Sequence, residues 1–107
     1  MTFVGFFSEM DVTMANNGSI NEFITDKVDY DKARIINYLL SFGRQAVCPR
    51  NAIDCVTGKT ISTSFAINDD GEYCWPDFLA YHIDHYSIKL PENFVQHILS
   101  KTTFANS

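Results

Sequence analysis

The chain has 107 residues, of which 46% are hydrophobic and 14% aromatic, and its net charge at pH 7 is −5. This length supports one hydrophobic core, so we expect a single domain over residues 1–107, and the apolar content excludes a generally disordered chain. The acidic balance argues against nucleic acid and anionic lipid as partners, because phosphate groups require a basic protein surface. The apolar runs are shorter than the roughly 20 residues that a membrane helix needs, and the N-terminus carries no basic leader. We therefore expect a cytoplasmic protein.

The first third of the chain predicts one short strand and one short helix. Residues 2–8 are apolar and rich in aromatic side chains, which favours a strand. Ser19 and Glu22 then have the spacing of a capping box, in which each side chain bonds the backbone N–H of the other residue. A short helix over residues 20–26 is expected to follow.

A longer helix is predicted over residues 30–42. Asp29 is expected as its N-cap, and Gly43 as the left-handed residue that ends it. Its apolar residues recur with helical spacing, which indicates one buried face. They are Ala33, Ile35, Ile36, Leu39, Leu40 and Phe42.

The middle of the chain alternates β-forming segments with turn signals. Thr57-Gly58 and Asp69-Asp70-Gly71 are typical turn sequences, and β-branched residues are frequent between them. This spacing predicts an antiparallel meander. Its strands are expected at residues 45–48, 52–56, 60–68 and 72–75.

Two prolines are expected to open the two C-terminal helices. Pro76 would be the first residue of a helix through Tyr86, and Pro91 would open a helix to about Ser100, because proline lacks the N–H that a first helical turn leaves unpaired. The predicted fold class is therefore α+β: a small antiparallel β-meander with N-terminal helices and two C-terminal helices packed on the sheet.

Candidate catalytic residues are few and scattered. His82 and His85 lie three residues apart on a predicted helix, but two ligands do not complete a zinc site. Cys74 precedes a predicted helix N-terminus, which could lower its pKa, yet the sequence indicates neither an oxyanion hole nor an orienting partner. The neighbouring carboxylates are explained by turns and helix starts. We therefore expect no metal, cofactor or catalytic residue, with a small metal- or thiol-dependent enzyme using these three residues as the alternative.

The acidity is concentrated between residues 69 and 92, where six acidic residues and one basic residue give −5. Trp75 lies at a strand-to-helix corner and is expected in the core. Acidic residues of this segment, together with the rings that are expected to be exposed, form a candidate surface for a protein partner. The predicted contact residues are Asp69, Asp70, Glu72, Tyr73, Tyr81, Asp84 and His85.

Four segments resemble a set of small cytoplasmic bacterial proteins: SINEFITD (19–26), KARIINYLLSFG (32–43), DCVTGK (54–59) and DGEYCWPDFLAYHIDHYSIKLPENFVQHI (70–98). The shared pattern is D-G-x-[WY]-x-W-P-x-x-L-A-Y, followed by L-P-x-x-F-x-x-H. Proteins with this pattern look like immunity proteins of polymorphic toxin and contact-dependent growth-inhibition systems. Cys74 and the aromatic-rich start TFVGFF depart from the pattern, so partner contacts cannot be transferred by position.

The resemblance implies a protein that neutralises a cognate toxin domain by binding it in the cytoplasm. Such toxins are often nucleases, which present cations to phosphates, so an acidic inhibitor surface would be complementary. An adaptor domain with a partner unrelated to toxins is a further alternative.

Overall fold

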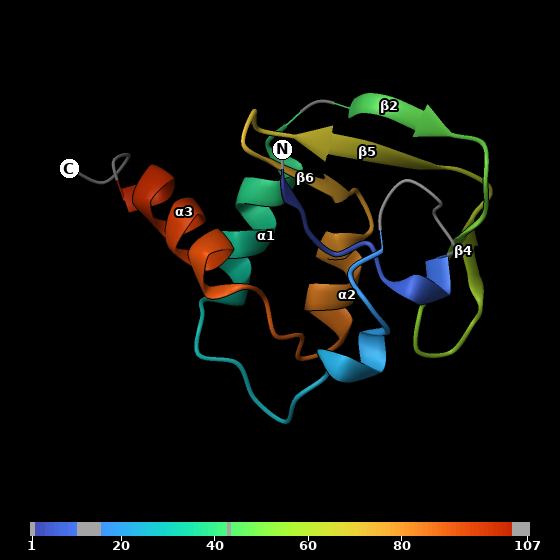
Figure 1. Cartoon of the computed structure of the whole chain (residues 1–107), viewed down its shortest axis with the longest axis horizontal. Coiled ribbons are helices and arrows are strands. Elements are labelled where there is room, and N and C mark those ends of the chain that lie inside the picture. Colours follow the sequence, from blue (N-terminus) through green and yellow to red (C-terminus); the bar gives the residue numbers. More distant parts are fainter. Residues whose placement is uncertain (1, 11–15, 43, 104–107) are drawn as a thin grey trace.

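The computed structural model describes residues 2–10, 16–42 and 44–103, and it confirms a small α+β fold (Figure 1). Within these described residues, the helical elements are two 3-10 turns and three α-helices. They are η1 (Ser8–Met10), η2 (Ile20–Glu22), α1 (Lys32–Leu40), α2 (Leu79–His85) and α3 (Glu92–Thr103). The strands are β1 (Thr2–Phe3), β2 (Arg44–Cys48), β3 (Ala52–Ile53), β4 (Thr60–Ser62), β5 (Phe65–Asp69) and β6 (Tyr73–Pro76).

Four strands form a mixed sheet in the order β1-β6-β5-β2, and β3 and β4 form a separate two-stranded sheet. β5 pairs antiparallel with β6, as the meander predicts, but β2 pairs antiparallel with β5 rather than with the next strand in the chain. β1 pairs parallel with β6, with Thr2 opposite Tyr73. Parallel neighbours need a long crossover, and nearly 70 residues separate β1 from β6. The sheet is therefore mixed rather than purely antiparallel.

Three predicted strands are shorter than expected. The strand predicted over residues 2–8 ends at Phe3, and the 3-10 turn η1 begins at Ser8. The strand predicted over residues 52–56 ends at Ile53, because the Asp54 carboxylate accepts the backbone N–H groups of Val56 and Thr57 and turns the chain. The strand predicted over residues 60–68 is divided into β4 and β5, which belong to different sheets. The chain changes sheets at this division.

The capping box at η2 is confirmed, since Ser19 and Glu22 bond each other's backbone N–H groups. The helix predicted over residues 20–26 is shorter in the structure, however, and ends at Glu22. Ile24 forms an antiparallel bridge with Ile88, so the backbone is already extended two residues after the 3-10 turn.

The start of the α1 helix was predicted wrongly. Its N-cap is Asp31 rather than Asp29, and the Asp31 carboxylate accepts the N–H of Arg34 at 3.3 Å. Leu40, predicted to face the core, is 63% exposed. The expected stop at Gly43 lies outside the described residues.

The two prolines behave differently. Pro76 is the last residue of β6 rather than the first of a helix, because the N–H of Asp77 still bonds Ala66 O across the sheet at 2.8 Å. Pro91 directly precedes α3, and its carbonyl accepts the N–H of Val95 at 3.1 Å, so this prediction is correct to within one residue. α3 continues to Thr103, beyond the predicted end.

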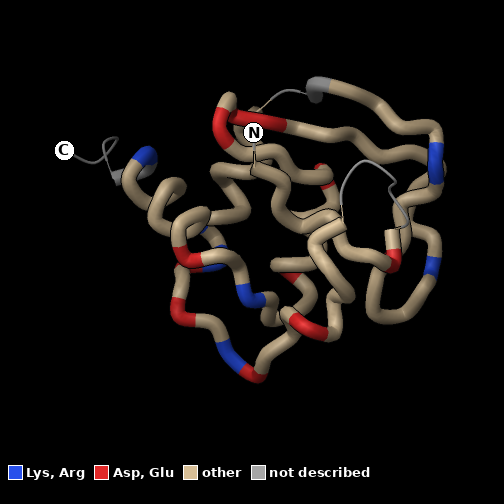
Figure 2. The backbone as a smooth tube through the Cα atoms, in the orientation of Figure 1, with Lys and Arg blue, Asp and Glu red and all other residues tan. Residues whose placement is uncertain are grey.

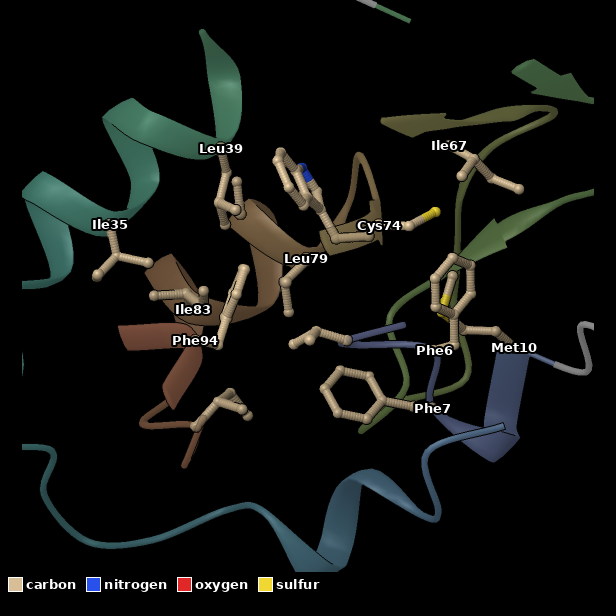
Figure 3. Close-up of a cluster of buried hydrophobic side chains, with 14 of the residues drawn as sticks. Phe6, Phe7, Met10, Ile35, Leu39, Ile67, Cys74, Leu79, Ile83 and Phe94 are labelled. Atoms are coloured by element: carbon tan, nitrogen blue, oxygen red, sulfur yellow. The ribbon is translucent and has the colours of Figure 1, made fainter. Parts of the chain in front are cut away.

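Side chains from all three α-helices and from the sheet meet in one core (Figure 3). Trp75 is fully buried in this core, which confirms the expectation for this residue. Phe42 packs edge-on against its ring from beyond the end of α1, and Phe94 packs against it from α3. The helices therefore cover the sheet around Trp75. Within the described residues, no helix is long and apolar enough to cross a lipid bilayer.

Candidate functional site

The turn between β5 and β6 is built around the carboxylate of Asp70. Its Oδ1 atom accepts the backbone N–H groups of Glu72 at 2.9 Å and Tyr73 at 2.8 Å. This is the local bonding expected of an aspartate in a turn, and Gly71 provides the positive φ of 96°. The local sequence therefore determines the shape of the turn.

The second oxygen of Asp70 joins the turn to two helices. Oδ2 accepts the hydroxyl of Tyr38 from α1 at 2.5 Å and lies 2.7 Å from Nε2 of His97 on α3. The Asp70 side chain is only 3% exposed. Burial by itself raises its pKa, but the hydrogen bonds from Tyr38, the turn N–H groups and His97 lower the pKa of Asp70 to about 2. We call Tyr38, Asp70 and His97 the Asp70 clamp.

His97 lies between two carboxylates. Nε2 faces Asp70, and Nδ1 lies 3.4 Å from a carboxylate oxygen of Glu72, whose side chain is 65% exposed. The imidazole also packs against the ring of Tyr73, with 4.8 Å between centroids. A histidine held by an aspartate supplies two of the three members of a hydrolase triad, but a triad also needs a nucleophile at the other ring nitrogen. In this clamp that position is occupied by a carboxylate.

A second buried carboxylate, Asp54, ties the loop between β3 and β4 to α2. Besides the two loop N–H groups, it accepts the hydroxyls of Tyr81 at 2.8 Å and Tyr86 at 2.6 Å. Burial raises the pKa of Asp54, but the hydrogen bonds from Tyr86, Tyr81 and the loop outweigh it and hold this pKa well below its ordinary value. Asp54 is therefore a structural anion in the described fold.

The histidines of α2 point in different directions. His82 is 1% exposed, bonds Phe78 O through Nδ1 at 2.8 Å and accepts the N–H of Cys55 at Nε2 at 2.9 Å. Burial lowers its pKa. His85 is exposed and stacks on the ring of Tyr81, with 4.0 Å between centroids. Among the described residues, no group of three or more His, Cys, Asp or Glu side chains is arranged to hold a metal ion.

The expectation that a following helix N-terminus lowers the pKa of the Cys74 thiol was wrong. Cys74 lies inside β6 and is 4% exposed, while α2 begins only at Leu79. Burial raises the pKa of this thiol. Burial likewise raises the pKa of Cys55 to about 12. Both thiols are therefore held in the protonated, weakly nucleophilic form.

The predicted contact residues lie on two separate parts of the molecule. The β5–β6 turn and α2 are well apart in Figure 1, and Figure 2 shows acidic residues gathered at the turn. Asp70 points inward, and the Tyr73 ring is half-buried against Phe94. The turn group is Asp69, Asp70, Glu72 and Tyr73, and the α2 group is Tyr81, Asp84 and His85.

The sequence pattern does not mark the clamp residues Tyr38 and His97 as site residues. They lie 32 and 27 residues from Asp70 in the chain, so no local spacing relates them to the turn. The only available signal was the histidine that ends the L-P-x-x-F-x-x-H pattern. Asp54 and Tyr86 were missed for the same reason.

No family model, curated protein or solved structure matches this chain. Any functional conclusion therefore rests on the residues of this chain and on their geometry.

Proposed function

We propose that this chain is an immunity protein that binds and neutralises a basic bacterial toxin domain, a nuclease, in the cytoplasm. The observation that carries this proposal is the acidic β5–β6 turn, which presents Asp69 and Glu72 on a support fixed by the Asp70 clamp. The resemblance of the sequence pattern to immunity proteins agrees with this role.

The clamp favours tight binding because it orders the turn before a partner arrives. Asp70 accepts four hydrogen bonds: two from the backbone of the turn, and two that tie the turn to α1 and α3. Asp69 adds a bond from the N–H of Gly71 at 3.1 Å. A preordered contact loop loses less conformational entropy on binding, so more of the contact energy contributes to affinity.

The charge of the turn suits a nuclease partner. A nuclease holds cations in its substrate cleft to bind phosphates, and carboxylates on an inhibitor can meet the same cations. Complementary charge can raise association to about 10⁸–10⁹ M⁻¹s⁻¹ at low salt. Rapid association matters for an inhibitor that must act before the toxin cleaves its substrate.

In this proposal the predicted contact residues have different tasks. Asp69 and Glu72 meet the partner, while Asp70 positions them from inside. Tyr81, Asp84 and His85 form a separate surface on α2. We place the contact at the turn and its surroundings, without α2.

The proposal can be tested with a toxin domain encoded next to this chain. The variant Asp69→Lys with Glu72→Lys reverses two charges at the turn. Its matched control is Asp26→Lys with Asp29→Lys, which reverses two exposed charges between η2 and α1. Binding kinetics are measured over a salt series, and thermal unfolding checks that each variant folds.

We expect the turn variant to bind at least 10-fold more weakly, mainly through slower association and with a smaller salt dependence. The control should change the affinity by no more than a few-fold. Equal losses for the two variants would show that only net charge matters and would refute the placement at the turn. Turnover of a substrate by the isolated chain would instead support the enzyme alternative.

A further inference from the structure

We propose that His97 is a proton-controlled latch on Glu72: with Nδ1 protonated it holds the Glu72 carboxylate against α3, and without this proton it releases Glu72 to a cationic partner. The identity of the partner rests on the proposed function. The latch itself is a property of the isolated chain and can be tested without a toxin.

The geometry locates the proton that controls the latch. An ionised carboxylate can only accept hydrogen bonds, and Nε2 of His97 lies 2.7 Å from Oδ2 of Asp70. Nε2 therefore carries a hydrogen in both charge states of the ring. The proton that is gained or lost is on Nδ1, the nitrogen that lies 3.4 Å from Glu72.

The two charge states act differently on the two carboxylates. With Nδ1 protonated, the imidazolium attracts Glu72. After deprotonation, a nitrogen lone pair faces the carboxylate, and the contact becomes repulsive. Asp70 cannot respond, because four hydrogen bonds hold it. Glu72 can rotate outward, since its side chain is 65% exposed.

The other groups around His97 keep their own protonation states. Asp70 stays ionised because its pKa is lowered to about 2. The Tyr38 hydroxyl, 3.5 Å from Nε2, stays protonated because burial and Asp70 raise its pKa. From β6, Tyr73 contributes the face of its ring. Histidine is the side chain whose ordinary titration falls between pH 5 and 8.

Loss of the proton changes both the charge and the shape of the turn. Asp69, Asp70, Glu72 and protonated His97 together carry −2, and neutral His97 leaves −3. At the same time Glu72 is free to join Asp69 in contacting a lysine or arginine of a partner. Binding of a cationic partner should therefore be stronger when Nδ1 carries no proton.

Nuclear magnetic resonance of the isolated, ¹⁵N-histidine- and ¹³C-glutamate-labelled chain tests the latch between pH 5 and 8. The His97 ring should be in the Nε2–H form when neutral, and the Glu72 side-chain signals should shift together with loss of the Nδ1 proton. In His97→Gln, which keeps an N–H donor for Asp70 but cannot titrate, this shift should disappear. In the matched control His85→Gln it should persist.

A neutral His97 in the Nδ1–H form would overturn the proposal without any variant being needed. Glu72 signals that stay constant from pH 5 to 8 in the native chain would overturn it as well. Because these measurements use no toxin, they are independent of whether the proposed function is correct.

A second measurement tests the effect on binding with tetralysine as the probe. Between pH 5.5 and pH 8, its affinity for the native chain should rise about 1.4- to 5-fold more than its affinity for His97→Gln, which corresponds to one exposed ion pair. Equal pH dependence of the two chains would show that the release of Glu72 does not contribute to cation binding, and would overturn that part of the proposal.

Discussion

Replacing Asp70 by asparagine removes the charge of the clamp and keeps its shape. The asparagine Oδ1 can still accept the two turn N–H groups, but its amide now meets the Tyr38 hydroxyl and Nε2 of His97, which both donate to Asp70 in the native chain. Hydrogen bonds to a charged acceptor are stronger than those to a neutral one. We therefore expect Asp70→Asn to lower the free energy of unfolding at pH 7.

The magnitude follows from the pKa of Asp70, which is lowered from 3.8 to about 2. At 1.36 kcal/mol per pKa unit this corresponds to at most about 2.4 kcal/mol, and solvent screening at the rim of the clamp reduces it to about 1–2 kcal/mol. The folded-state pKa is the lower one, so this stabilisation is present above pH 4 and is lost as the pH falls towards 2.

Urea unfolding at several pH values between 3 and 7 measures the effect. The control is Asp69→Asn, because Asp69 accepts the N–H of Gly71 without joining the turn to a helix. At pH 7 the midpoint of Asp70→Asn should fall by about 0.5–1 M urea for a typical urea dependence, and that of the control should hardly move. The reasoning is refuted if both variants unfold alike at pH 7, or if the deficit of Asp70→Asn stays constant down to pH 3.

Three further outcomes follow from the core and its borders. Gly5→Ala should lower the free energy of unfolding by about 1–3 kcal/mol, because the φ of Gly5 is 79° and an added Cβ would lie 2.7 Å from a Leu79 methyl. The control is Gly58→Ala, where φ is 78° and the space around an added Cβ is open, and it should cost less in the same urea assay. Burial lowers the pKa of His82, so the stabilisation of the fold by neutral His82 is present above about pH 6.5 and is lost as the pH falls below it. In that range the free energy of unfolding of the native chain should decline by up to about 1.4 kcal/mol per pH unit, and that of His82→Gln should decline less. A thiol reagent should label Cys48 in the folded protein and the two buried thiols only after denaturant is added, so equal labelling rates would contradict their burial.

Short-range signals in the sequence predicted the features that depend on neighbouring residues. The capping box at Ser19, the turn at Asp70-Gly71 and the helix after Pro91 all form, because each depends on bonds between residues at most four positions apart. The α+β class followed from the order of the predicted elements, and the burial of Trp75 from its place near the end of a predicted strand. An error of a few residues occurred where pairing with another strand overrode the local signal. Pro76 ends β6 instead of opening a helix, because the N–H of the next residue bonds Ala66 O in β5.

The tertiary structure alone decided the strand order, the parallel pairing of β1 and the clamp around Asp70. Composition and spacing indicated an acidic segment, but they did not distinguish its buried carboxylates from its exposed ones. Folding separates them: Asp70 is buried because Tyr38 and His97, from two distant helices, supply the donors that compensate for the loss of water. Glu72, two residues away, stays at the surface. Whether a carboxylate is a support or a contact depends on the partners that folding brings to it, and the spacing of residues along the chain does not contain that information.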